Sequence, residues 1–246
     1  MHPRVFRDAG SGLVLVAHGT RSPAGAQTIT ELVAAASARI GPVATAFLDV
    51  LGPNPAEVLA GMTVPAIVVP AFLASGYHVR TDLPARVAES GHRGTVVTRA
   101  LGPDGVLARV MHVRLIEAGW LPGDAVVMAA AGSSDPVARR ELRCAAAMLA
   151  EHVGDVHLSY VATGAPSVRG VVRLLRNAGH RRVFIASYML AHGLFHDRLT
   201  ACGASAVTPP LGVHSDIVDL VVSRFAGAIA AVSEGGRRTS LSVGGN

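Results

Sequence analysis

The feature that most constrains the fold of this chain is a succession of short apolar runs separated by amphipathic helical segments. This alternation is typical of a parallel sheet built from strand-helix-strand units. Half of the residues are hydrophobic but only 4% are aromatic, which suits buried parallel strands covered by alanine-rich helices. The expected strands are residues 13–17, 43–48, 66–70 and 95–98 in the first half, and 125–130, 156–161 and 182–187 in the second.

The order of these segments begins again after a turn-rich stretch at residues 118–124. The segment VLVAHGTRSPAG is echoed by VVMAAAGSSDPVA, AFLDVLGPNP by SYVATGAPSV, and VVPAFLASGYH by IASYMLAHGLF. The repetition predicts an internal duplication: two tandem α/β domains, residues 1–121 and 122–234, each a parallel sheet flanked by helices. The polar, glycine-rich residues 235–246 are predicted to form a disordered tail.

Three polar residues of the first half follow directly after, or shortly after, expected strands. His18 follows the first strand, Asp49 follows the second, and His78 lies in the loop after the third. Ligands of open parallel sheets bind outside the carboxyl ends of the strands. We therefore expect two imidazoles and one carboxylate to converge on one edge of the first sheet.

The second half provides an internal comparison for this triplet. Its echoed positions hold Ala131, Ala162 and Phe195, so all three polar groups are missing together. Coordinated loss predicts that the triplet acts as one functional unit. Neutral imidazole binds divalent ions and accepts protons near neutral pH, and a carboxylate adds a third ligand or a second proton acceptor.

Three segments of the first half resemble the class II chelatases, the family of sirohydrochlorin cobaltochelatases and ferrochelatases. They are LVAHGTR (15–21), AFLDVLGPNP (46–55) and VPAFLASGYHVRTDLP (69–84), and GLFHDRL (193–199) is similar to the second half of the long, two-domain members. The resemblance implies two chelatase-type domains facing each other across a cleft. It also implies insertion of a divalent metal ion into sirohydrochlorin, with no permanent cofactor and no requirement for ATP.

The resemblance further implies roles for individual residues. His18 and His78 are expected to be metal ligands and catalytic residues, one of them also taking protons from the pyrroles. Asp49, expected to be catalytic too, stands where relatives usually have glutamate, and its shorter side chain favours action through water. Four further residues are expected to bind the macrocycle or its acetate and propionate groups: Arg21, Arg80, His192 and His196.

The substrate metal is expected to be Fe²⁺ or Co²⁺, with Ni²⁺ as a third candidate, since histidine and carboxylate ligands do not select among these ions. A non-catalytic protein that binds or delivers metal or tetrapyrrole stays open as an alternative, because binding and insertion use the same ligands. A monomer is expected, because the duplication lets one chain build the cleft.

Other features of the sequence narrow the class of protein. All 22 basic residues are arginines spread along the chain without a basic block, which argues against a nucleic-acid partner. No apolar stretch approaches the ~20 residues of a membrane span, and the first residues lack the apolar core of a signal peptide. Cys144 and Cys202 have no Cys-x-x-Cys partner, so neither a disulfide framework nor a cysteine metal site is expected. We expect a cytoplasmic protein.

Two other enzyme classes fit the sequence poorly. Histidine phosphatases need an arginine directly before the histidine of a His-Gly pair, and this chain has Ala17 there. A zinc hydrolase is not favoured because no His-Glu-x-x-His segment occurs. The remaining histidines that match no motif are given structural or solvated roles: His112, His152, His157 and His180.

Overall fold

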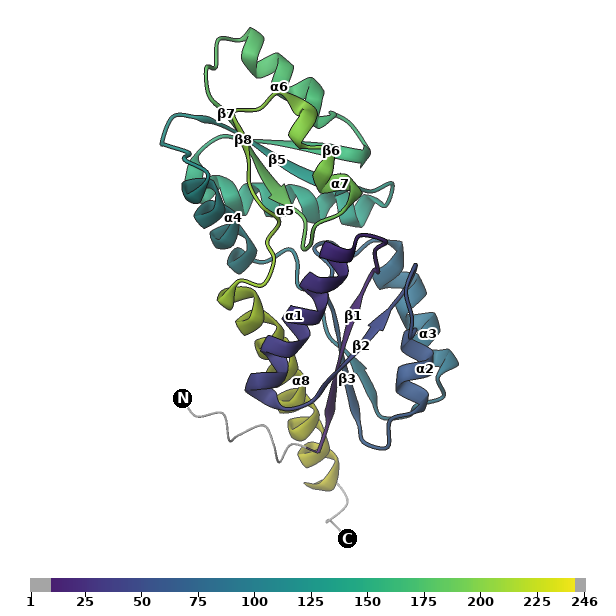
Figure 1. The fold of residues 1–246 in the computed structure, drawn as a ribbon. Helices are drawn as coiled ribbons and strands as arrows, with labels where there is room; N and C mark the ends of the chain where they lie inside the picture. The colour runs from purple at the N-terminus through teal and green to yellow at the C-terminus, as the bar shows by residue number, and fades with distance from the viewer. Residues whose placement is uncertain (1–9, 242–246) are drawn as a thin grey trace.

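The computed structural model describes residues 10–241, with side chains up to residue 234, and it confirms the α/β class with two sheets. Each sheet has four parallel strands, in the orders β2-β1-β3-β4 and β6-β5-β7-β8. The two orders are equivalent, so the second half repeats the topology of the first (Figure 1). The strands are β1 (Gly12–Ala17), β2 (Val43–Phe47), β3 (Ala66–Pro70), β4 (Thr95–Val97), β5 (Ala125–Gly132), β6 (Val156–Thr163), β7 (Val183–Tyr188) and β8 (Ala206–Val207).

Helices connect the strands and begin where the sequence supplies a cap. The side chains of Ser22, Asn54 and Asp135 each accept a hydrogen bond from a backbone N–H of the first helical turn, and a proline follows each of them. The helices are α1 (Pro23–Ile40), α2 (Pro55–Ala60), η1 (His78–Asp82), α3 (Leu83–Glu89), α4 (Gly105–Glu117), α5 (Pro136–Val153), α6 (Val168–Asn177), α7 (Leu194–Asp197), η2 (Thr200–Cys202) and α8 (Ser215–Leu241).

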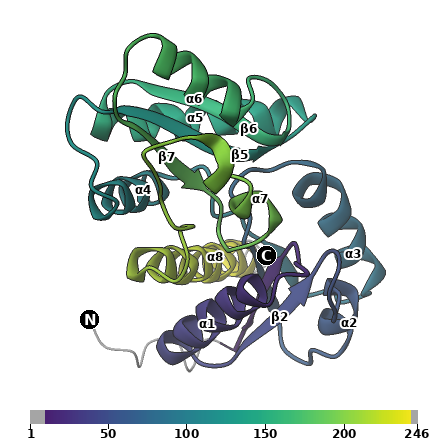
Figure 2. The same ribbon diagram turned by 45° about the horizontal axis from the view of Figure 1, so that its top comes forward.

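The last helix of each half packs against the other half. Helix α4 closes the first repeat in sequence but lies against α5 and β7, whereas α8 closes the second repeat and lies against α1 and β3. Figures 1 and 2 show α8 beside α1 and α4 beside the second sheet. The predicted division at residue 121 therefore does not follow the packing. The first structural unit comprises residues 10–101 and 215–241, and the second comprises the residues between them.

The predicted disordered tail also differs from the structure in part. Helix α8 continues to Leu241, so residues 235–241 are helical. Residues 242–246 lie outside the described residues.

A buried ion pair between Arg224 and Asp104 stabilises the segment in which the chain passes from the first unit to the second. The Arg224 guanidinium on α8 donates to the carboxylate of Asp104 at 2.9 Å and to the carbonyls of Ala100 and Leu101 at 3.3 and 3.1 Å. Asp104 is also the N-cap of α4, where it accepts from the backbone N–H of Val106 at 3.0 Å. One arginine thus links the exchanged helix α8 to the first turn of the exchanged helix α4.

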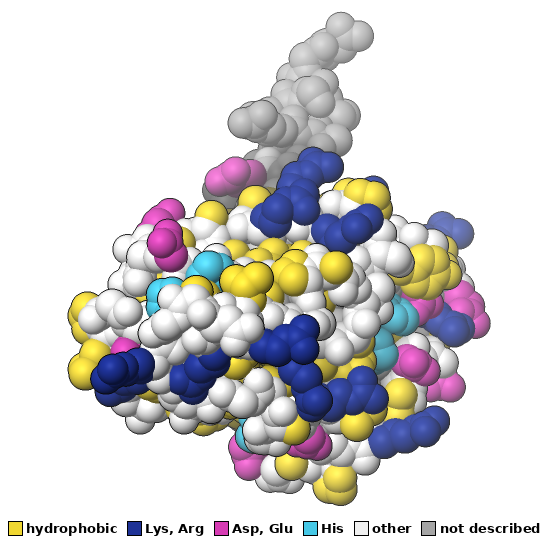
Figure 3. Space-filling model, turned by 90° about the horizontal axis from the view of Figure 1, so that it is seen from above, with side chains coloured by type: hydrophobic (Ala, Val, Ile, Leu, Met, Phe, Trp, Pro, Cys, Tyr) yellow, Lys and Arg dark blue, Asp and Glu magenta, His cyan; other side chains and the backbone are white. Residues whose placement is uncertain are grey.

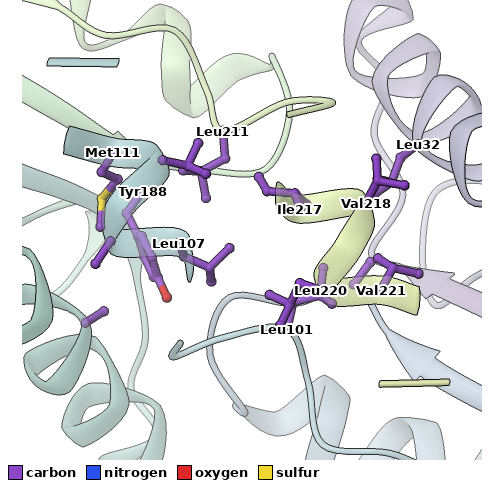
Figure 4. Packing of buried hydrophobic residues seen from close by; sticks show 14 of the residues in the cluster. Leu32, Leu101, Leu107, Met111, Tyr188, Leu211, Ile217, Val218, Leu220 and Val221 are labelled. Atoms are coloured by element: carbon purple, nitrogen blue, oxygen red, sulfur yellow. The ribbon is translucent and has the colours of Figure 1, made fainter. Parts of the chain in front are cut away.

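The hydrophobic core is continuous across the two units. Leu32 and Val218 lie at the α1–α8 contact, while Met111 and Tyr188 belong to the same buried cluster on the side of the second sheet (Figure 4). Ile217 and Leu211 lie between these two groups (Figure 4). Because the interior is shared, the units are held together by apolar burial as well as by the ion pair.

The loop after the third strand of each half packs on the start of the first helix of the other half. A Cβ placed on Gly76 would lie 3.6 Å from Ser133 Oγ, and a Cβ placed on Gly193 would lie 3.6 Å from Thr20 Oγ1. These two contacts correspond to each other in the repeats. They bring the carboxyl ends of both sheets together, which positions the site described next.

Candidate metal and substrate site

A cavity of about 670 Å³ lies between the carboxyl ends of the two sheets. Its size is in the range of pockets that enclose small organic ligands. Both halves contribute to its walls, which consist mainly of small and apolar residues. The histidines on its walls are His18 and His78 from the first half and His192 and His196 from the second.

The position of His18 is fixed by the backbone at the end of β1. Its carbonyl accepts a hydrogen bond from Asp49 N at 2.8 Å, which continues the pairing of β1 with β2 by one residue. The next residue, Gly19, has a φ of +98°, and a Cβ there would lie 1.9 Å from the carbonyl oxygen of Asp49. Only glycine fits this turn. The imidazole of His18, which precedes this turn, is exposed and lines the cavity.

His78 begins a single turn of π-helix, η1, which runs into α3. Single π turns are frequent at functional sites. The ring nitrogen Nδ1 of His78 lies 3.2 Å from Oδ2 of Asp82, one turn further along the helix. A carboxylate only accepts hydrogen bonds, so Nδ1 carries the proton and the lone pair of Nε2 is available to a ligand.

The structure brings the two predicted metal ligands together. The rings of His18 and His78 are 4.5 Å apart between centroids and nearly perpendicular, at 78°. Phe72 lies 6.3 Å from the first ring and 6.5 Å from the second. Nδ1 of His18 lies 3.3 Å from its neighbouring carbonyl, that of Gly19, an arrangement that also favours a free lone pair on Nε2.

The backbone of Asp49 is hydrogen-bonded to that of His18, but no side-chain contact of Asp49 with His18 or His78 is seen among the described residues. Its Oδ1 accepts from the backbone N–H of Val50 at 2.8 Å, and Asp49 does not line the cavity. Among residues whose side chains are described, no three His, Cys, Asp or Glu side chains are arranged to hold a metal ion. The carboxylate therefore does not complete a three-ligand site in this structure, and its catalytic role stays a prediction.

The two predicted carboxylate-binding arginines lie outside the cavity lining. Arg21 is exposed, and Arg80 pairs with Asp135 of the other half at 3.7 Å. Figure 3 shows arginine side chains scattered over one face of the protein among hydrophobic and acidic groups. The geometry assigns Arg80 to the contact between the halves, because its charge already faces an acidic N-cap.

The two histidines of the second half differ from each other. His196 is buried, and its Nε2 lies 3.0 Å from the carbonyl oxygen of Thr208, so this nitrogen carries the proton. His192 is exposed and packs edge-on to the ring of His196 at 4.9 Å. Both line the cavity, and His196 also has a structural hydrogen bond; their role in binding the macrocycle stays a prediction.

Tyr188 closes the cavity at the boundary between the halves. Its hydroxyl donates to the carbonyl of Leu73 at 2.9 Å. Burial raises the pKa of Tyr188 strongly, and the nearby carboxylates of Glu141 and Asp104 raise it further. The phenol therefore stays protonated and acts as a fixed donor between the two units.

Asp82 is the residue that sequence reasoning missed. It lies within the matched segment VPAFLASGYHVRTDLP, four positions after His78. A spacing of four places two residues on the same face of a helix, and that signal was enough to find it. The sequence predicts a loop at His78, and a spacing of four has this meaning only in the helix that the structure shows there.

Comparison with known proteins places the chain beside one family. The CbiX family model matches residues 12–118 and matches again over residues 125–228. Each match covers one of the two repeats in the sequence. No curated protein sequence matches the chain significantly.

Solved structures share the fold over nearly the whole chain. SirB from Bacillus subtilis with Fe³⁺ is 23% identical, with a TM-score of 0.76 over 92% of this chain and 97% of that one. The sirohydrochlorin chelatase SirB from Bacillus subtilis subspecies spizizenii with cobalt is 19% identical, with a TM-score of 0.69 over the same shares. CbiX, described as the terminal enzyme of siroheme biosynthesis in denitrifying bacteria, is 20% identical, with a TM-score of 0.68 over 88% of this chain and 99% of that one.

Proposed function

Because the chain belongs to the CbiX family, whose model matches both of its halves, we propose that it is a chelatase that inserts a divalent metal ion into sirohydrochlorin. Two structures of similar fold are of SirB, one with Fe³⁺ and one, named a sirohydrochlorin chelatase, with cobalt. Fe²⁺ and Co²⁺ are the proposed substrates of this chain, with Ni²⁺ as a third candidate. The metal is consumed in each turnover and is not a resident cofactor.

The observation that carries the proposal is the pair of imidazoles on the wall of an apolar cavity. His18 and His78 come from the ends of different strands and meet with ring centroids 4.5 Å apart. Imidazole nitrogen is a good ligand for ferrous and cobalt ions. The apolar walls around the pair suit the flat, mostly apolar face of a tetrapyrrole.

A two-ligand site also explains how the ion is released. Two imidazoles leave most coordination positions of the ion to water, and pyrrole nitrogens can replace these waters one at a time. A complete shell of protein ligands is typical of structural sites, which retain their metal. The low ligand count at His18 and His78 therefore favours transfer of the ion over storage.

The second half serves as the opposite wall. The equivalents of His18 and His78 are Ala131 and Phe195, both on the cavity lining. The strand registers give the same equivalence. When Gly19 is aligned with Gly132, Leu15 falls on Met128, and their partners in β3 and β7 are Val69 and Ala186, from which the same count leads to His78 and Phe195. One wall thus holds the ion, and the other presents an apolar surface to the macrocycle.

We also propose that the protein acts as a monomer in the cytoplasm. One chain supplies both walls of the cavity, which supports the monomer. Cys144 and Cys202 are free thiols, as is usual in a reducing compartment. No helix within the described part of the chain has the length and apolar character needed to cross a bilayer.

Anaerobic incubation with sirohydrochlorin and Fe²⁺ or Co²⁺ tests the function. We expect many turnovers per protein molecule, seen as the absorbance change of the macrocycle after the spontaneous rate is subtracted. Stoichiometric uptake of metal or macrocycle without turnover would instead identify a carrier protein. Comparison of the rates with Fe²⁺, Co²⁺ and Ni²⁺ ranks the metals.

Replacing Asp82 by asparagine is expected to weaken metal binding by about 10- to 100-fold, the usual effect of losing the carboxylate partner of a metal-binding histidine. The variant removes the charge that orients the His78 ring at 3.2 Å. Titration with Co²⁺, followed by its visible absorption, measures the affinity.

Glu89→Gln is the matched control for this change. Glu89 is an exposed carboxylate at the end of the adjacent helix α3, where it pairs with Arg86 at 3.0 Å. Both substitutions remove one negative charge, but only Asp82 touches His78. An equal loss of affinity in the two variants would contradict the orienting role of Asp82.

A further inference from the structure

We propose that His192 accepts the pyrrole protons that are released during metal insertion. This inference rests on the proposed function and assigns a catalytic role to the second half of the chain. It separates the two tasks of the reaction, so that His18 and His78 hold the ion while an imidazole from the other half removes protons.

The stoichiometry of insertion requires such an acceptor. Each of two pyrrole N–H bonds breaks heterolytically, the electron pair stays on nitrogen and forms the bond to the metal, and a proton leaves. The lone pair of an imidazole that binds the ion cannot accept a proton at the same time. While His18 and His78 hold the metal, the proton must go to another group.

Few other groups on the cavity can take a proton. Among the described lining residues there is no carboxylate and no arginine, and the titratable groups are histidines and tyrosines. Tyrosine phenols are protonated at neutral pH, and burial raises the pKa of Tyr188 further. Besides the two metal ligands, this leaves His192 and His196 as candidate acceptors.

The surroundings of these two histidines distinguish them. The carbonyl of Thr208 holds the proton on Nε2 of His196 at 3.0 Å, which leaves only Nδ1 to accept, and because the side chain is buried a proton taken there has no exposed route to water. Neither ring nitrogen of His192 hydrogen-bonds another residue within the described part of the chain, and its side chain is exposed. His192 can therefore take a proton from the macrocycle, pass it to water, and then take the second.

The backbone at His192 lies against the first turn of α1, the helix that follows His18 in the sequence. A Cβ on Gly25, near the start of α1, would lie 2.4 Å from the carbonyl oxygen of His192, so the two backbones are in close contact. The ring of His196 is a titratable group that packs against His192, at 4.9 Å. The charged residues nearby in the sequence are Arg21, which precedes α1, and Asp197 and Arg198, which follow His196.

Kinetics of His192→Gln and His192→Ala test the proposal. With metal and sirohydrochlorin both saturating, we expect kcat to fall at least about 100-fold, within the range for removal of a general base. We expect the affinity for Co²⁺, measured by its visible absorption, to change less than about threefold, since general-base catalysis is separate from ligand binding. The acid limb of the kcat–pH profile should disappear.

His180→Gln is the matched control, because His180 is an exposed histidine of the second half that does not line the cavity. It should retain the wild-type kcat and pH profile. Wild-type kcat and an unchanged acid limb in His192→Gln would overturn the inference while leaving the chelatase proposal standing. A parallel loss of Co²⁺ affinity would also overturn it, since His192 would then be a ligand. Absence of turnover in the wild type would instead reject the proposed function, and this inference with it.

Discussion

Replacement of either His18 or His78 by alanine is expected to lower the rate of metal insertion at least about 100-fold, because losing even the partner of a ligand costs 10- to 100-fold in affinity or activity. The two rings lie 4.5 Å apart and form the metal-binding pair of the cavity. Removing one leaves a single imidazole to compete with water for the ion. Anaerobic initial rates at several Fe²⁺ or Co²⁺ concentrations measure the effect.

His157→Ala is the control for this pair of variants. His157 is exposed on β6 and does not line the cavity, so its loss should leave insertion unchanged. Both ligand variants should keep the thermal stability of the wild type, because neither side chain is buried. If either variant inserts metal at the wild-type rate, the ion is held elsewhere and the proposed site is wrong.

Replacement of Arg224 by methionine is expected to lower the free energy of unfolding by about 3 kcal/mol, the lower end for breaking a buried ion pair. The Arg224 side chain is 8% exposed, and its loss leaves the Asp104 carboxylate and two backbone carbonyls without their donor. Urea unfolding of the two proteins side by side measures the difference.

The matched control uses the other partner of the same carboxylate. Arg99 pairs with Asp104 at 3.3 Å, but its side chain is 69% exposed, so Arg99→Met should cost less than about 1 kcal/mol. Adding Asp104→Asn to Arg224→Met should recover part of the loss, since asparagine still caps α4 without an unpaired charge. Equal costs for the two arginine variants would show that the buried pair contributes nothing specific.

The contribution of this ion pair also depends on pH. Burial raises the pKa of Asp104, but the hydrogen bond from Val106 and the guanidinium of Arg224 outweigh burial, and the pKa is lowered from its ordinary value of 3.8. The folded protein therefore binds fewer protons than the unfolded chain near this pH. The stabilisation is complete above pH 3.8 and is lost as the pH falls through the lowered value.

Much of the fold follows from the sequence because the local signals agree with each other. The seven expected strands lie within a few residues of the observed strands β1 to β7, and they recur in the same order in both halves. The meeting of His18 and His78 also follows, since both come after strands whose carboxyl ends share one edge. Because β1 pairs directly with β3, His18 and His78 are close in space although they are 60 residues apart in the sequence.

The exchange of helices could not be predicted, because an amphipathic helix carries no sign of which sheet it covers. Helix α4 ends the first repeat in the sequence, but it lies against α5 and β7 of the second. The positions of the Arg21 and Arg80 side chains could not be predicted from the sequence either. A long side chain near a histidine in sequence can point to solvent or to another unit, and Arg80 reaches Asp135 across the boundary.

The helix exchange limits which fragments of this protein can fold on their own. A break at the repeat boundary near residue 121 would leave the first sheet without α8 and would give the second fragment a helix that belongs elsewhere. A first unit with its own covering helices would instead have to join residue 101 to residue 215, a fusion that no truncation from either end produces, and it would still lack the second wall of the cavity. The duplicated chain is modular in its sequence but indivisible in three dimensions.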